Sequence, residues 1–218
     1  MDFAKDFPIW DQLTAQQQQL LLENVKLRTV PAGTVLHNAG MDCLGVLLIC
    51  SGQLRAYILS EEGREITIDR MFSGDICILS ASCALPDLQM DIVVETEKES
   101  AIWIIPAMVY KSLMQTSPAV ANQFSALLSS VFSQLIWLVE QVMWKRFDKR
   151  LADFLLEESM LNGSDCLKLT HEKIANHLGT AREVVTRTLR YFQSDGMVRL
   201  TRGTVEILDR KALADIPQ

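Results

Sequence analysis

The sequence predicts an α+β protein built from an antiparallel β domain, one long helix and a C-terminal winged helix-turn-helix. Short apolar runs that end in glycine turns repeat through the first half of the chain. A segment without charged residues follows between Lys111 and Glu140, and its apolar residues have helical spacing. The last third places two helical segments around a glycine and then a hairpin pattern.

Composition excludes several classes of protein. The chain has 218 residues, of which 49% are hydrophobic and 22% charged, as in globular proteins of one or two domains. Its five cysteines include no Cys-x-x-Cys pair, so we expect reduced thiols in a cytoplasmic protein and no zinc ribbon. The acidic start of the chain lacks the apolar core of a signal peptide. Because there are three histidines and no Walker loop or Ser-His-Asp order, we expect no enzyme.

Residues 1–116 are expected to form the β domain, after a short helix over residues 13–25. The turn Glu61-Glu62-Gly63-Arg64 has the composition of a hairpin tip, where Gly63 provides a positive φ. Strand-length runs separated by such turns are typical of an antiparallel sandwich or barrel. The expected strands are residues 35–37, 44–50, 54–59, 66–71, 92–94 and 101–105.

Residues 117–146 are expected to form a long helix and a hinge. Two apolar stripes run along this helix, so one should pack on the β domain and the other on a second copy of the chain. We assign the first stripe to a homodimer interface, since a helix of this length extends beyond a small domain. The alternative is a core helix within one chain. The first stripe comprises Val120, Phe124, Leu127, Val131, Leu135, Leu138 and Val142, and the second Leu128, Phe132, Ile136, Val139 and Met143.

The same helix has the length of a membrane span. Serine and glutamine residues interrupt it, and no basic cluster follows its first half to fix an orientation. We therefore expect no contact with a membrane.

Residues 147–218 are expected to form the winged helix-turn-helix. Helices are expected over residues 148–160, 171–178 and 181–193, followed by a hairpin of residues 198–200 and 205–208. The formal net charge of the whole chain is −6, which alone argues against binding to nucleic acid. However, residues 168–211 contain nine basic and five acidic residues, whereas residues 1–144 contain eight basic and 16 acidic residues. The positive charge therefore coincides with the helix-turn-helix.

The second helix of this motif has the residue types that read DNA. Arg182 and Arg187 can bind guanine O6 and N7, and Glu183 can accept from cytosine N4. Thr170, Thr180, Thr186, Arg190 and Arg202 are expected to contact phosphates. Two structural alternatives exist: Thr180 and Glu183 fit a helix capping box, and Glu183 and Arg187 fit a surface ion pair. A winged helix that binds protein instead of DNA is a further alternative.

Several motifs in the chain resemble the Crp/Fnr family, the cyclic-AMP receptor and fumarate–nitrate reductase regulators of bacterial transcription. Two specific blocks carry the resemblance, Leu169-Thr170-His171-Glu172-Lys173-Ile174-Ala175 and Gly179-Thr180-Ala181-Arg182-Glu183-Val184-Val185-Thr186-Arg187. Weaker marks are Pro31-Ala32-Gly33-Thr34, Ser51-Gly52, Glu62-Gly63-Arg64-Glu65-Ile66, Ser73-Gly74-Asp75 and Arg150-Leu151-Ala152.

The resemblance implies a fold, partners and a set of site residues. It implies a jelly-roll β-roll of the cyclic-nucleotide-binding type over residues 1–116, a dimerisation helix over 117–146 and a DNA-binding winged helix over 147–218. The partners would be palindromic double-stranded DNA, a second copy of the chain and, for an activator, RNA polymerase. Arg182, Glu183 and Arg187 occupy the base-reading positions of the family.

Cyclic AMP is not expected to be the effector. In family members that bind it, an arginine holds the cyclic phosphate. The glutamate of a Gly-Glu motif, directly after the glycine, holds the ribose. Here Asp75 stands for that glutamate, and residues 71–105 contain no arginine. A cyclic phosphate would therefore lack its bidentate partner.

The remaining effector-pocket candidates are Gly74, Asp75, Cys77 and Cys83. The two cysteines are either buried small hydrophobic residues or a thiol redox sensor. No cysteine precedes Cys43, so the N-terminal cluster of the iron–sulfur branch is absent. A haem or metal sensor is a weaker alternative, because no histidine lies near this segment and His37 is expected in or beside a strand.

Overall fold

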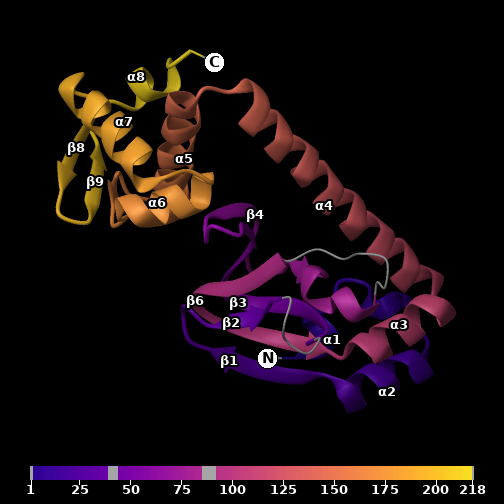
Figure 1. Ribbon diagram of the computed structural model, residues 1–218. Helices are drawn as coiled ribbons and strands as arrows, with labels where there is room; N and C mark the ends of the chain where they lie inside the picture. Colours follow the sequence, from indigo (N-terminus) through magenta and orange to yellow (C-terminus); the bar gives the residue numbers. More distant parts are fainter. Residues whose placement is uncertain (1, 39–43, 85–91, 218) are drawn as a thin grey trace. The chain divides into compact units, whose positions relative to one another are not determined.

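The structure is a computed structural model, and it describes residues 2–38, 44–84 and 92–217 (Figure 1). The chain divides into two compact units. The first contains residues 1–58 and 68–135, and the second contains residues 59–67 and 136–218. The predicted fold class is confirmed: an antiparallel β-roll, a long helix and a C-terminal helix-turn-helix with a β-hairpin follow one another along the chain.

The first unit is built on a six-stranded sheet with the order β1-β6-β3-β4, to which β2 and β5 add through β6 and β3. Apolar residues from this sheet and from the surrounding helices form its core. The strands are β1 (Lys26–Val30), β2 (Val35–His37), β3 (Val46–Leu59), β4 (Glu65–Met71), β5 (Ile76–Cys77) and β6 (Ile92–Ile105).

Two of these strands are longer than predicted. The sequence suggested a turn at Ser51-Gly52, but β3 continues through it and pairs with β6 on both sides, with shifts of register between Ile49 and Leu54. Gly52 has φ +96°, and a Cβ atom there would lie 2.3 Å from the Ser100 hydroxyl. The glycine is therefore required by a β-bulge with close backbone contact, not by a hairpin.

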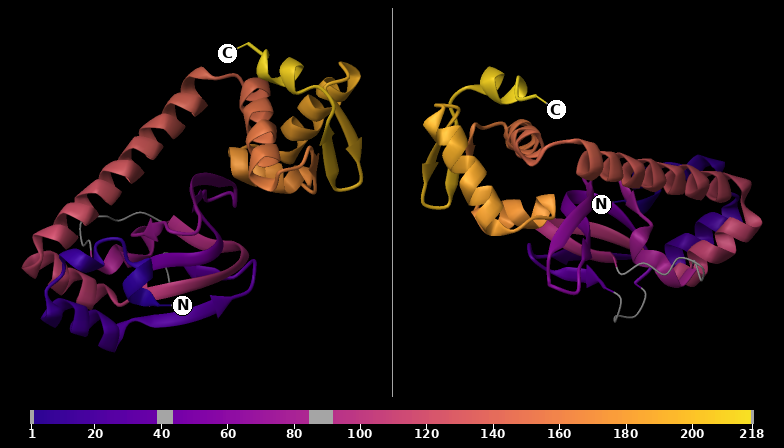
Figure 2. Two further views of the ribbon diagram at one scale, coloured as in Figure 1. Left: turned by 180° about the vertical axis from the view of Figure 1, so that it is seen from behind. Right: turned by 45° about the horizontal axis from the view of Figure 1, so that its top comes forward.

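Helices pack against the sheet of the first unit, and Figure 2 shows α3 and the beginning of α4 beside one end of it. Thr14 and Gln17 form a capping box at the start of α2, so this helix begins at Ala15, two residues after the predicted start. The helical elements are α1 (Phe3–Asp6), η1 (Trp10–Gln12), α2 (Ala15–Asn24), η2 (Leu79–Ala84), α3 (Ala107–Thr116) and α4 (Pro118–Trp144), the last of which continues into the second unit.

The second unit is a helix-turn-helix with a small sheet of order β7-β9-β8. Helix α6 has the predicted bounds, because Thr170 caps its start and Gly179, with φ +65°, ends it in the left-handed conformation. The short strand β7 was not predicted. The elements are α5 (Phe147–Asn162), β7 (Cys166–Leu167), α6 (His171–Leu178), α7 (Arg182–Ser194), β8 (Val198–Thr201), β9 (Thr204–Ile207) and α8 (Arg210–Ala214).

Along the first half of α4, the stripe that was predicted to face a second copy packs on the β-roll instead. Val120 and Phe124 are buried in the core of the first unit, and Leu127 and Val131 pack against that core. These four residues of the predicted dimer stripe are therefore occupied within the chain. Instead, the second stripe is exposed, and it comprises Leu128, Phe132, Ile136, Val139 and Met143, together with Val142.

Candidate nucleic-acid interface

Helix α7 has one buried face and one free face. Val185, Leu189 and Phe192 are fully buried in the core of the second unit and hold the helix in place. On the other face, the structure brings together most of the predicted DNA-contacting residues, which line a shallow surface groove: Arg182, Glu183, Thr186, Arg187 and Arg190. The groove contains three guanidinium groups and one carboxylate, so it is a positively charged surface of the kind that attracts phosphates.

The charged side chains of this face have no partner within the described part of the chain. Neither Glu183 nor the guanidinium groups of Arg182, Arg187 and Arg190 make a hydrogen bond or an ion pair with a described residue. The two structural alternatives from the sequence are not formed. Ala181, not Thr180, is the N-cap of α7, and no side chain caps the helix. These side chains are thus available to an external ligand.

His171 belongs to the same surface, although the sequence analysis did not single it out. Its Nδ1 atom lies 2.9 Å from Thr186 Oγ1, which joins the start of α6 to α7. Burial lowers the pKa of His171, and the nearby charges of Arg182 and Arg190 lower it further. The ring is therefore uncharged at neutral pH.

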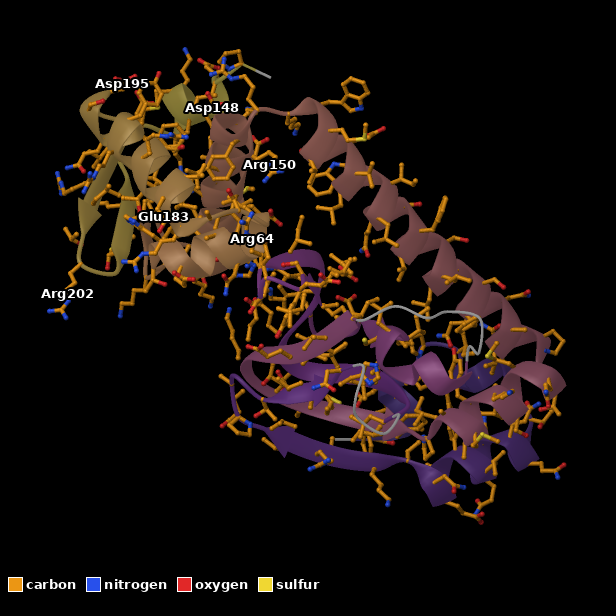
Figure 3. All side chains as sticks on the ribbon, in the orientation of Figure 1. Arg64, Asp148, Arg150, Glu183, Asp195 and Arg202 are labelled. Atoms are coloured by element: carbon orange, nitrogen blue, oxygen red, sulfur yellow. The ribbon has the colours of Figure 1, made fainter. Side chains whose placement is uncertain are left out.

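Arg190 lies in the groove, and the four other predicted phosphate contacts differ in whether their side chains are available to a phosphate. Thr170 caps α6 by accepting a hydrogen bond from Lys173 N at 3.1 Å, which leaves its hydroxyl proton free. The Thr180 side chain makes no hydrogen bond with a described residue. Thr186 Oγ1 has two partners within the chain, the Arg182 carbonyl oxygen and His171 Nδ1, each at 2.9 Å, so it is less available to a phosphate oxygen than Thr170 or Thr180. Arg202 is exposed in the turn between β8 and β9, away from the groove of Glu183 (Figure 3).

The predicted effector-pocket residues lie in the first unit, around the start of β5. Gly74, with φ +95°, and Asp75 form a turn in which the Asp75 carboxylate accepts a hydrogen bond from Phe72 N at 2.7 Å. Asp75 is exposed, whereas Cys77 is almost fully buried. The Cys83 side chain, Cys43 and residues 85–91 lie outside what the structure describes.

The burial of Cys77 favours the first of its two alternatives, a small hydrophobic residue of the core. Burial raises the pKa of the Cys77 thiol, and hydrogen bonds with Ser80 only partly oppose that shift. A thiol held in its protonated form is a poor nucleophile, which disfavours a redox role for Cys77. His37 is buried as well, and burial lowers its pKa. Within the described ranges, no group of three or more His, Cys, Asp or Glu side chains could hold a metal ion.

Two family models match this chain. A Crp-like helix-turn-helix domain matches residues 149–216, and a cyclic nucleotide-binding domain matches residues 27–117. The first match covers α6 and α7 with the groove, and the second covers all six strands of the β-roll except the first residue of β1.

Solved structures and curated proteins are similar over nearly the whole chain. A crystal structure of a Crp/Fnr-family transcriptional regulator from Eubacterium rectale is 52% identical, with a TM-score of 0.94, over 96% of this chain and 97% of the other. The cyclic AMP receptor protein of Thermus thermophilus is 23% identical over 97% of each chain. The c-di-GMP-responsive regulator CLP of Xanthomonas campestris shares the fold, with a TM-score of 0.72, 19% identity and coverage of 89% and 99%. The chain therefore belongs to the Crp/Fnr family of transcriptional regulators, which are DNA-binding proteins and not enzymes.

Proposed function

We propose that this protein is a cytoplasmic homodimer that binds a palindromic DNA site through α7 and that responds to an effector other than cyclic AMP. The observation that carries the DNA-binding part is the free, positively charged face of α7, whose opposite face is fixed in the core. Arg182, Glu183 and Arg187 are the proposed base-reading residues. Thr170, Thr180, Arg190 and Arg202 are the proposed phosphate contacts.

The exposed stripe of α4 supports the dimer. Phe132 is 64% exposed and Met143 65%, in a stripe that continues over several turns. Exposed apolar stripes of this length mark interaction surfaces, and a heptad-like stripe fits a second copy of the same helix. By length and composition alone α4 could also cross a membrane. We favour the second helix because Ser125, Ser129 and Ser133 lie beside the stripe, and polar residues are tolerated at a helix surface in water.

The proposed effector is a small molecule without a cyclic phosphate. No arginine occurs between residues 71 and 105, and Asp75 places a carboxylate at the start of the pocket segment. Because Cys77 is buried, we favour a small-molecule effector over thiol redox sensing. If the protein is an activator, RNA polymerase is its further partner.

The experiment that tests DNA reading begins with selection of duplexes from a random pool by the full-length protein. Arg182→Ala should cost about 1–3 kcal/mol of binding free energy and relax the preference at one base pair of each half-site. Arg190→Ala should weaken binding to all duplexes equally, because a phosphate contact carries no sequence information. If no duplex is retained, or if Arg182→Ala also weakens all duplexes equally, the proposed base-reading role is wrong.

A further inference from the structure

The Thr186 hydroxyl has two partners and one proton. Its oxygen lies 2.9 Å from the Arg182 carbonyl oxygen and 2.9 Å from His171 Nδ1. The carbonyl oxygen can only accept, so both contacts are hydrogen bonds at once only when His171 Nδ1 is the donor to Thr186. We therefore assign the proton of the neutral ring to Nδ1, which leaves a lone pair on Nε2.

The Nε2 atom is left open to the surroundings. It makes no hydrogen bond with any residue that the structure describes, and it is not one of the buried polar atoms without a partner. Arg182 and Arg190 of α7 are the charged groups whose fields act on the ring. Both line the groove that presents the base-reading residues. His171 also begins α6, where the free backbone N–H groups add positive potential.

We propose that His171 binds a DNA phosphate through Nε2 and takes up one proton from solvent as it does so, which makes DNA binding pH-dependent. This inference rests on the proposed DNA-binding function. Nε2 with a lone pair repels a phosphate oxygen, whereas Nε2–H of the imidazolium donates a charge-assisted hydrogen bond to it. The phosphate supplies the anion that the free site lacks, since the charged groups acting on the ring are both cations.

The direction of the pH effect follows from linkage. In the free protein, the pKa of His171 lies below its usual value of 6.5, so the ring is neutral at pH 7. A bound phosphate raises that pKa, and the DNA complex then holds one more proton per protomer than the free protein. The affinity for DNA therefore rises as the pH falls from the pKa of His171 in the complex to its pKa in the free protein. Outside this window the affinity is constant.

The test measures DNA affinity of the full-length protein at about pH 8 and about pH 6, with a duplex that the wild-type protein has selected from a random pool. The wild-type Kd should fall by roughly tenfold or more, since uptake of one proton by a protomer changes the affinity about tenfold for each pH unit within the window. His171→Asn keeps a donor for Thr186 but cannot titrate, so its affinity should lack this pH dependence. His171→Arg, a permanent cation, should bind tightly at both pH values.

Two further readouts separate the possible failures. Nitrogen chemical shifts should show the Nδ1–H tautomer of His171 in the free protein at about pH 7.5, and the Nε2–H tautomer would overturn the proposal. If the duplex binds but His171→Asn has the same pH dependence as the wild type, this inference fails and the proposed function stands. If no duplex is retained from the pool, the proposed function fails and this inference fails with it.

Discussion

The hydroxyl oxygen of Thr170 accepts a hydrogen bond from the backbone N–H of Lys173 at 3.1 Å, and it thereby caps α6, the helix whose first residue contacts Thr186 of α7. The same hydroxyl retains a proton that can be donated to a phosphate. Its capping role and its proposed DNA role can be separated, because aspartate is as good an N-cap as threonine but carries a negative charge.

Thr170→Asp should retain the stability of the second unit and yet weaken DNA binding, since its carboxylate repels phosphates. Thr170→Ala should lower the free energy of unfolding by about 1 kcal/mol and weaken DNA binding less than the aspartate does. Thermal unfolding and DNA titrations of both variants provide the comparison. An aspartate variant that binds DNA as tightly as the wild type would remove Thr170 from the phosphate contacts.

Phe132→Glu should convert the protein to a monomer, because it places a charge in the centre of the exposed stripe of α4. Trp137→Glu is the matched control: Trp137 is similarly exposed but lies about 140° around the helix from Phe132. Sedimentation analysis of both variants should show a monomer for the first and a dimer for the second. A dimeric Phe132→Glu variant would mean that another surface joins the two copies.

Asp69→Asn should stabilise the protein at pH 7. Burial is the main reason that the pKa of Asp69 is raised to about 6, and hydrogen bonds from the Arg70 backbone N–H and from Gln134 only partly oppose this effect. Since the carboxyl ionises less readily in the folded chain, the free energy of unfolding falls as the pH rises from about 4 to about 6. The asparagine variant avoids this loss, so it should be more stable by about 1–2 kcal/mol at pH 7 and equal to the wild type near pH 4. Urea unfolding across this range measures the difference, and a constant difference at every pH would contradict it.

Cyclic AMP should not bind with micromolar affinity, although a cyclic nucleotide-binding domain model matches residues 27–117. The reason is the absence of an arginine from residues 71–105, which leaves the cyclic phosphate without a bidentate partner. Isothermal titration calorimetry with the full-length protein gives a direct answer. Micromolar binding would show that another cation replaces the arginine.

Local signals made the helix-turn-helix predictable. The bounds of α6 follow from a threonine cap and a glycine stop, both of which act within a few residues. The same reasoning failed at Ser51-Gly52, because a glycine with positive φ suits a turn as well as a bulge. Only the pairing of β3 with β6, which joins distant parts of the sequence, distinguishes the two.

The sites show the same division between local and long-range information. Periodicity revealed two stripes on α4, but it does not say which stripe meets the β-roll. Val120 and Phe124 were therefore predicted to face a second copy, whereas they are buried in the core of the first unit. Residue type, helical spacing and the family resemblance singled out Arg182, Glu183 and Arg187 in the sequence, and the structure places them in one groove. The sequence did not single out His171, because its proposed role depends on a contact with Thr186, on a different helix.

The separation of the two faces of α7 has a consequence for how this regulator can change over evolutionary time. Val185, Leu189 and Phe192 hold the helix in the core, and none of them is among the residues that line the groove. Substitutions at Arg182, Glu183 or Arg187 break no intramolecular bond with a described residue, and surface changes of this kind alter stability by only about 0.5 kcal/mol. With these three as the proposed base-reading residues, single substitutions would give new operator preferences in a protein that still folds, and duplicated copies of it could then regulate separate sets of genes.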